Sequence, residues 1–205
     1  MKDKYQTLLD DQGKDYLNRM ENATGRMQRL INDLLDYSRL STKDQPFIAI
    51  ELFKIVKDVL SDLDILIEKK KAKIEISQLP VIEADPIQIQ QLFQNLITNA
   101  LKFQKPEQTP VIKISHKMKV DSGQKYCEIY VEDNGIGIEK NYCEKIFSIF
   151  QRLHGRNEYE GTGIGLAICK KVVEIHNGRI SVESILGKGT KFMIVLPIKQ
   201  NKEKI

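Results

Sequence analysis

The sequence contains no tryptophan and only three cysteines among its 205 residues. Cys127, Cys143 and Cys169 form no CxxC pair, which argues against a disulfide framework and against a structural zinc site. We therefore expect a reduced, cytoplasmic setting. No apolar run approaches the roughly 20 residues of a membrane-spanning helix, and the polar residues 1–4 lead into no signal-type segment. The sequence thus predicts no membrane segment in this chain.

Excess charge of one sign is also scarce, since the formal net charge is only +4. Lysines cluster at residues 69–73, but no aromatic side chains accompany them as a platform for stacking bases. We interpret the cluster as the solvated C-terminal end of a helix and expect no nucleic-acid partner. With 41% hydrophobic and 29% charged residues, the chain is typical of a packed domain with a short extra element.

Residues 15–40 repeat apolar side chains in steps of four and three, which predicts a long amphipathic helix. The stripe is wider than a two-stranded seam and suits a helical bundle. It consists of Tyr16, Leu17, Met20, Ala23, Met27, Leu30, Ile31, Leu34, Leu35 and Tyr37. We expect this helix to pair with a second copy in a homodimer; the alternative is that it folds back on the rest of the chain. A polar turn at residues 41–46 predicts a boundary between segment 1–45 and domain 46–205.

Beyond that turn the helical and strand periods alternate. Helices are expected at 52–67, 86–103 and 164–176, and strands at 73–77, 81–84, 111–120, 126–133, 179–184 and 191–197. Asp85 before Pro86 is a typical helix start, and Asn177 with Gly178 is a typical left-handed cap. Antiparallel strands with helices on one face give an α+β fold, a two-layer α/β sandwich preceded by a long helix.

The helix expected at 86–103 carries Asn95, Asn99 and Lys102 on one face, with Gln88 and Gln91 above them. A plain solvent-exposed face is the alternative. Asparagine is a poor helix former, however, so two of them four residues apart suggest that their amide oxygens are needed as ligands. An amide oxygen suits Mg²⁺, and a lysine one turn further can meet phosphate.

Asp133 ends a strand in which Cys127, Ile129 and Val131 occupy one face, and the period of two places the carboxylate on that face. An inward acid needs a hydrogen-bond donor, which the amino group of adenine can supply. The alternative is an Asx-turn, because Asp-Asn-Gly is a common turn sequence. The continuation with Gly137 between two isoleucines favours a flat slot over a hairpin turn.

Gly161, Gly163 and Gly165 alternate with other residues at the start of the helix expected at 164–176. Such a loop lets backbone N–H groups and a helix N-terminus approach phosphate, although a simple flexible loop is the alternative. The spacing is neither GxGxxG nor GxxxxGK, which excludes the dinucleotide-fold and P-loop classes. The polar residues 151–160 predict a lid that carries Arg152, His154 and Arg156.

In this order the motifs resemble the ATP-binding catalytic region of sensor histidine kinases, within the GHKL superfamily that includes gyrase-type ATPases. The N box corresponds to residues 95–103, the three glycine boxes to 133–138, 161–166 and 187–190, and the F box with the start of the lid to 146–154. Residues 15–40 resemble the second helix of the kinase dimerisation domain.

The resemblance implies ATP and Mg²⁺ as cofactors. Asn99 would ligate Mg²⁺, Asp133 would accept from the adenine amino group, and the catalytic residues would be Asn95, Lys102 and Arg152. The implied ATP contacts are Asn95, Asn99, Lys102, Phe103, Asp133, Gly135, Gly137, Ile138, Phe150, Arg152, His154, Gly161, Thr162, Gly163, Ile164, Gly165, Leu166 and Thr190.

Two departures from the family pattern bear on activity. The hydrolytic relatives carry a glutamate where this chain has Asn95, whose amide cannot take a proton from water, so phosphoryl transfer is favoured over hydrolysis. The acceptor histidine should precede residue 10, yet the only histidines are His116, His154 and His176. We therefore expect this chain to be part of a longer kinase and to bind ATP without phosphorylating itself. Its partners would be the acceptor-histidine helix of the full-length kinase and a response regulator receiver domain. The alternatives are a GHKL-type ATPase and a non-catalytic nucleotide-binding dimerisation module.

Overall fold

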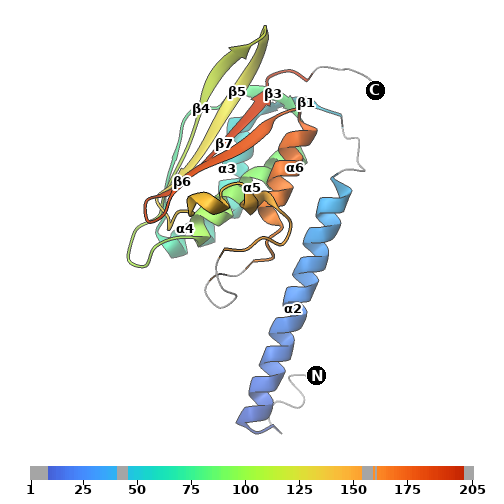
Figure 1. Cartoon of the computed structure of the whole chain (residues 1–205), viewed down its shortest axis with the longest axis vertical. Helices are drawn as coiled ribbons and strands as arrows, with labels where there is room; N and C mark the ends of the chain where they lie inside the picture. The colour runs from blue at the N-terminus through green and yellow to red at the C-terminus, as the bar shows by residue number, and fades with distance from the viewer. Residues whose placement is uncertain (1–8, 41–45, 154–158, 160, 201–205) are drawn as a thin grey trace.

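The computed structural model describes residues 9–40, 46–153, 159 and 161–200, and Figure 1 shows one long helix attached to an α/β body. The helices are α2 (Asp11–Arg39), α3 (Leu52–Asp62), α4 (Asp64–Lys70), α5 (Pro86–Lys102) and α6 (Gly165–Ile175), with short 3-10 helices η2 (Lys140–Tyr142) and η3 (Lys145–Phe147). The strands are β1 (Ile48–Glu51), β2 (Lys73–Ile76), β3 (Val81–Ala84), β4 (Val111–Asp121), β5 (Gln124–Asp133), β6 (Arg179–Ile185) and β7 (Gly189–Pro197).

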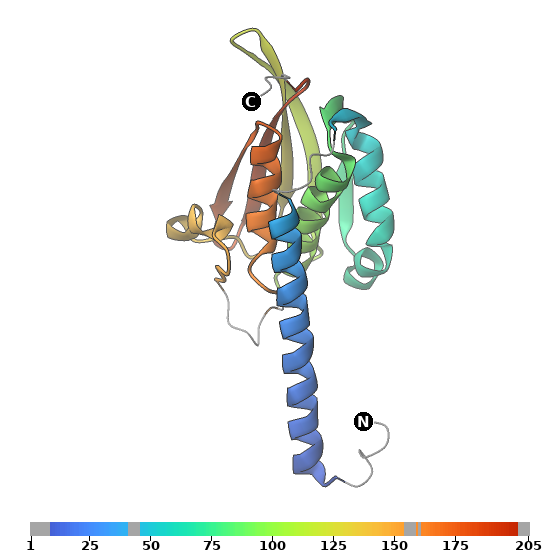
Figure 2. The same cartoon turned by 90° about the vertical axis from the view of Figure 1, so that its right-hand side faces the viewer.

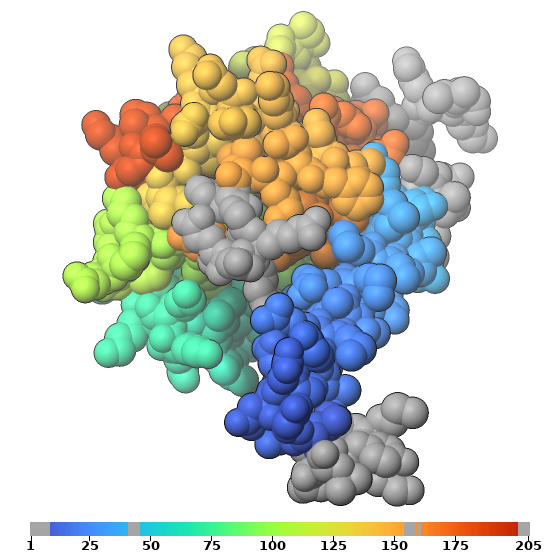
Figure 3. Space-filling view, turned by 60° about the horizontal axis from the view of Figure 1, so that its bottom comes forward, coloured from blue at the N-terminus to red at the C-terminus, as the bar shows by residue number. Residues whose placement is uncertain are grey.

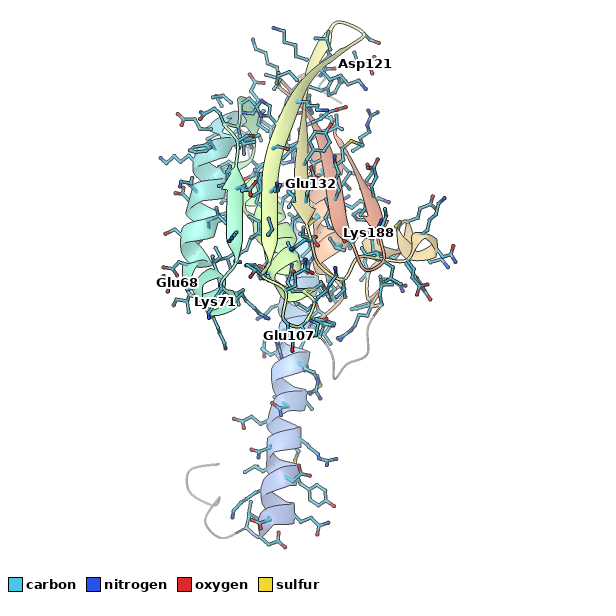
Figure 4. All side chains as sticks on the ribbon, turned by 90° about the vertical axis from the view of Figure 1, so that its left-hand side faces the viewer. Glu68, Lys71, Glu107, Asp121, Glu132 and Lys188 are labelled. Atoms are coloured by element: carbon cyan, nitrogen blue, oxygen red, sulfur yellow. The ribbon has the colours of Figure 1, made fainter. Side chains whose placement is uncertain are left out.

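The main sheet has the strand order β2-β4-β5-β7-β6, and β1 pairs with β3 in a separate two-stranded sheet. Helices α3, α5 and α6 cover one face of the main sheet (Figure 1). None of the described helices covers the opposite face, where Glu132 lies (Figure 4). The predicted α+β two-layer architecture with a leading helix is therefore confirmed. Among the described residues, no helix is long and apolar enough to cross a bilayer.

Three details differ from the sequence-based expectation. The single helix expected at 52–67 is broken at Leu63, where the Asp64 carboxylate accepts from the N–H of Ile65 and competes with a continuous helix. Strand β1 was not predicted, because four residues with only Ile50 buried give too short a pattern. Strand β2 runs parallel to β4, and side-chain periodicity carries no information on strand direction.

The core lies between the sheet and the helices, and the predicted inward residues Cys127, Ile129 and Val131 of β5 are buried there. Helix α5 contributes a fully buried apolar face, which leaves Asn95 and Asn99 half-buried on its other side. Gln88 was predicted from the sequence to lie above Asn95 on this face of the helix, and the span of α5 agrees with that position. Its side chain is buried near the N-terminus of α5, and its Oε1 has no hydrogen-bond partner among the described residues.

Helix α2 projects from the body (Figure 2). Two neighbouring faces of this helix differ in their burial. Leu30 and Tyr37 pack against the core of the body, and Leu40 just beyond the helix is buried. Six apolar side chains of the predicted stripe stay exposed on the other face: Tyr16, Met20, Met27, Ile31, Leu34 and Leu35. The fold-back alternative thus applies to one face of α2, and the other face remains open for a partner.

His176 joins the C-terminal end of α6 to the start of α5 inside the core. Its side chain is fully buried, its Nε2 accepts from the N–H of Asp85 at 3.0 Å, and its Nδ1 donates to the carbonyl of Val172 at 2.8 Å. The ring also contacts Phe47, with 4.8 Å between the centroids. Burial lowers the pKa of His176 from its ordinary value of 6.5, although Val172 and Asp85 act in the opposite direction.

This buried imidazole should make stability depend on pH. Below about pH 6.5 the unfolded chain takes up a proton that folded His176 resists, so the free energy of unfolding falls until the folded pKa is passed. His176→Gln keeps one donor and one acceptor but cannot titrate, so urea denaturation at several pH values should give a flatter curve. The raised pKa of Asp133 increases the free energy of unfolding as the pH falls, which is opposite to the effect of His176. Because the wild type and His176→Gln both contain Asp133, its contribution cancels when their curves are compared. If the curves of the wild type and His176→Gln were parallel, the pH dependence could not be assigned to His176.

Candidate nucleotide-binding site

One cavity of about 400 Å³ lies between α5, the loop that leads into α6, and the end of β5. Most of the residues predicted from the sequence line it: Asn95, Asn99, Lys102, Phe103, Asp133, Gly137, Ile138, Arg152, Gly161, Thr162, Gly163, Gly165, Leu166 and Thr190. These residues come from segments up to 95 positions apart (residues 95–190). The fold therefore gathers at one place the groups that the motifs had marked separately.

Among the predicted contacts, three described residues are not in the cavity wall, and one residue is not described. Gly135 packs against main chain, and a Cβ added to it would lie 2.2 Å from the carbonyl oxygen of Phe103. Ile164 is fully buried in the core, whereas Phe150 is exposed outside the cavity. His154 lies outside the described residues. For Gly135 and Ile164 the structure indicates a packing role.

Several wall residues were missed from the sequence: Arg29, Asp33, Thr98, Ala100, Ile136, Ile146, Gln151, Leu153, Tyr159 and Phe192. Phe192 could have been found, because it is two positions beyond Thr190 on the same face of β7. Arg29 and Asp33 belong to α2 and reach the cavity only because α2 packs on the body. The local sequence pattern around Arg29 and Asp33 does not predict that contact.

Asp133 forms one end of the cavity, where it lies opposite Thr190 in the β5–β7 pairing. Its Oδ1 accepts from the N–H of Gly135 at 2.8 Å, and the backbone N–H of Thr190 also donates to the carboxylate. Burial raises the pKa of Asp133 to about 6, and the two hydrogen bonds oppose that rise. The turn bond and the inward carboxylate thus coexist. Above pH 6 this end of the cavity offers a negatively charged acceptor to a ligand.

The glycine loop lies directly against the polar face of α5. A Cβ added to Gly161 would lie 2.8 Å from Nζ of Lys102, and one added to Gly165 would lie 2.9 Å from Oδ1 of Asn95. The carbonyl of Asn95 is turned this way because its Nδ2 donates to the carbonyl of Gln91 at 3.0 Å. The absence of side chains at these two positions allows the loop and the start of α6 to approach the helix.

Cations and rings gather at the same end of the cavity. The guanidinium of Arg152 donates to the carbonyls of Gly161 and of Tyr159, the latter at 2.8 Å. Nζ of Lys102 lies 4.2 Å from the centroid of the Phe103 ring, and the ring of Tyr159 lies 5.0 Å from the same ring. Lys102 and Arg152 therefore both lie at Gly161, whereas the Asp133 carboxylate lies at the end of β5. Such a cavity complements a ligand with a donor at one end and a negative charge at the other.

Helix α2 touches this cationic end of the cavity. The hydroxyl of Thr162 in the glycine loop donates to Oδ2 of Asp33. Arg29, one turn earlier in α2, also lines the cavity. Figure 3 shows the blue surface of α2 against the orange surface of the loop region. A carboxylate of the helical segment is therefore held at the loop that the sequence marks for phosphate.

The described residues offer no cluster of three or more His, Cys, Asp or Glu side chains suited to a metal ion. Amide oxygens of the wall, together with oxygens of a ligand, would be donors for a cation bound in the cavity. Asn99, half-buried on the polar face of α5, supplies such an oxygen. This donor set suits a hard cation such as Mg²⁺ better than it suits zinc.

Two family descriptions match the sequence. Residues 84–200 match the histidine kinase-, DNA gyrase B- and HSP90-like ATPase family, and residues 2–43 match the His Kinase A (phospho-acceptor) domain. The first match covers more than half of the chain and includes most of the cavity wall.

Curated relatives include the phytochrome-like protein Cph1 of Synechocystis, 41% identical over 195 residues, which are 95% of this chain and 25% of Cph1. The sensor histidine kinase WalK of Bacillus subtilis is 38% identical over 190 residues, 89% of this chain and 30% of WalK. The chain thus spans about a quarter of the length of the first of these relatives.

Solved structures share the fold. The catalytic domain of histidine kinase ThkA superposes with a TM-score of 0.63 at 27% identity, over 76% of this chain and 97% of ThkA's. Full-length ShkA in complex with AMPPNP gives a TM-score of 0.71 at 23% identity, over 94% of this chain and 40% of ShkA's. The ShkA likeness extends over α2 as well as the body.

Proposed function

The chain belongs to the family of histidine kinase-, DNA gyrase B- and HSP90-like ATPases, and from this premise we propose that it is the ATP-binding catalytic part of a sensor histidine kinase. It transfers the γ-phosphoryl group of ATP to a histidine on a bundle helix, from which a response regulator receiver domain receives it. The observation that carries the proposal is the single cavity that joins Asp133 to the amides, cations and glycine loop.

Asp133 and the cationic end have separate tasks in this proposal. The Asp133 carboxylate accepts a hydrogen bond from the adenine amino group, and this contact fixes the base. Lys102 and Arg152 neutralise the charge of the phosphate tail, and the N-terminus of α6 adds backbone donors. Little covalent chemistry is asked of the protein, since phosphoryl transfer depends mainly on positioning and on charge neutralisation.

Asn99 and Asn95 divide the remaining work at the phosphate end. The amide oxygen of Asn99 holds Mg²⁺, which neutralises phosphate charge when it is bound. Asn95 lies beside Gly165 and has no basic group to activate water. The site therefore favours transfer to a histidine nucleophile over hydrolysis.

The chain is not expected to phosphorylate its own described histidines. His176 is fully buried, and Nδ1 of His116 is buried without a hydrogen-bond partner among the described residues. The acceptor is therefore proposed to lie on a separate helix that packs on the open apolar stripe of α2, in a homodimeric bundle. The stripe that begins with Tyr16 and Met20 is available for that contact.

Transfer between separate pieces tests this proposal. The chain is mixed with a separately made histidine-containing bundle segment, ATP labelled on its γ-phosphate, and Mg²⁺. We expect acid-labile label on the histidine of the segment and no label on the chain alone. Steady release of labelled phosphate without any acceptor would instead support an ATPase. Absence of both outcomes despite ATP binding would leave a non-catalytic module.

The contact between α2 and the glycine loop gives a prediction on affinity. Asp33→Asn removes a negative charge beside the place assigned to the phosphate tail, so ATP should bind roughly fivefold more tightly, or by about 1 kcal/mol. Titration at low and high salt measures it, and the gain should shrink as salt screens the charges. Asp36→Asn, an exposed site one turn further along α2, is the matched control. Equal affinities for Asp33→Asn and the wild type at low salt would contradict the prediction.

A further inference from the structure

Ser184 on β6 connects three segments around the base end of the cavity. Its hydroxyl donates to the carbonyl of Gly189 at 2.8 Å, and its Oγ accepts from the backbone N–H of Ile138 at 2.8 Å. Its Oγ also lies 3.1 Å from Oγ1 of Thr190. Thr190 and Ile138 line the cavity, whereas Ser184 stands behind them.

Counting protons settles the direction of the third bond. A serine hydroxyl has one proton and two lone pairs. The proton of Ser184 goes to Gly189, because a carbonyl oxygen can only accept, and one lone pair takes the N–H of Ile138. With Ser184 as donor to Gly189, all three contacts are hydrogen bonds only when the hydroxyl of Thr190 donates to the remaining lone pair of Ser184. Oγ1 of Thr190 is left with acceptor capacity alone.

The neighbouring backbone donors are also in use. The N–H groups of Gly135 and Thr190 both donate to Asp133, and that of Ile138 donates to Ser184. What these groups offer a base is thus the Asp133 carboxylate and the Thr190 oxygen, which both accept. A purine with an amino group at its 6-position supplies two donors to them. A purine with a 6-carbonyl oxygen places an acceptor against acceptors.

We propose that Ser184 is a positioning residue for base selection: by holding the Thr190 hydroxyl as an acceptor, it makes the site prefer a 6-amino purine nucleotide over a 6-oxo one. The inference rests on the proposed ATP site and adds a selectivity device to it. Without Ser184 the Thr190 hydroxyl is free to rotate. It can then donate to a 6-carbonyl oxygen while the Asp133 carboxylate accepts a hydrogen bond from N1–H of the same base.

The test compares the affinities of ATP and inosine triphosphate, which differ at the 6-position, for wild type and for Ser184→Ala. The dissociation constant of inosine triphosphate divided by that of ATP measures the preference for ATP. This ratio should become about tenfold smaller in the variant, which is the scale of one hydrogen bond. A purely structural role would weaken both nucleotides in parallel and leave the ratio unchanged. Ser181→Ala, an exposed serine on the same strand, should behave as wild type.

Thr190→Val supplies a second test that does not depend on Ser184. It removes the hydroxyl while keeping the shape, so the ratio should fall here too. Ser184→Ala added to Thr190→Val should then change the ratio no further, because Thr190 no longer has a hydroxyl to orient. A further change would assign the selectivity to the N–H of Ile138, which Ser184→Ala also frees, and would overturn the inference. An unchanged ratio in Thr190→Val, or in a folded Ser184→Ala, would overturn the inference. If the wild type binds neither nucleotide, the proposed function itself fails, and the two failures are thereby distinguished.

Discussion

Asp133→Asn should weaken ATP binding by about 1–3 kcal/mol, which is roughly 5- to 150-fold in the dissociation constant. The carboxylate is the acceptor assigned to the adenine amino group, and it is held in place by the N–H groups of Gly135 and Thr190. An asparagine side chain keeps the shape but loses the charge. Its NH₂ group must also face a donor, which is either the adenine amino group or the N–H groups of Gly135 and Thr190. Both the bond to the base and the local turn are then weakened.

The pH dependence sharpens this first prediction. The pKa of Asp133 is raised to about 6, so the ligand-free wild type loses the carboxylate charge as the pH falls below that value. The difference in affinity between wild type and Asp133→Asn should therefore be largest near pH 8 and should shrink below pH 6. Asp121→Asn, in the exposed β4–β5 turn, is the matched control. Equal affinity of wild type and Asp133→Asn at pH 8 would remove Asp133 from the site.

Asn99→Ala should abolish the Mg²⁺-dependent part of ATP binding and slow phosphoryl transfer to a supplied acceptor by roughly 100-fold or more, the scale of losing one preorganised electrostatic contact. Asn99 is the half-buried amide of the cavity wall to which the metal is assigned. The described residues hold no cluster of acidic side chains that could take over the metal. Binding without metal should change little.

The measurement for Asn99→Ala is a pair of titrations, with Mg²⁺ and with a chelator, together with the transfer assay. Gln94→Ala on the exposed side of α5 controls for a general effect on the helix. A variant whose affinity still rises on addition of Mg²⁺ would show that the metal is held elsewhere. A fall in affinity under both conditions, with a lowered thermal midpoint, would indicate damage to the fold.

The sequence predicted the elements with strong local signals. Helix α5 was expected at 86–103 and spans Pro86–Lys102, because Asp85 caps it and its apolar face is long. The inward face of β5, and with it Asp133, followed from the period of two. Strand β1 and the break at Leu63 were missed, since a four-residue strand and a local aspartate contact carry little pattern.

The missed parts of the site depend on tertiary contacts. Asp33 meets Thr162 across 129 positions of the chain, and Ser184 meets Ile138 across 46. Local periodicity gives no information on such pairs. The heptad rhythm of α2 predicted a bundle helix, but it did not reveal that a neighbouring face of the same helix completes the cavity wall.

The decisive experiment is titration calorimetry of this chain with a non-hydrolysable ATP analogue and Mg²⁺. We expect saturable binding at one site, weakened in Asp133→Asn and dependent on Mg²⁺ only while Asn99 is present. Absence of binding heat at millimolar analogue, together with unchanged amide signals of Asp133 and Gly165 in a nuclear magnetic resonance titration, would contradict it.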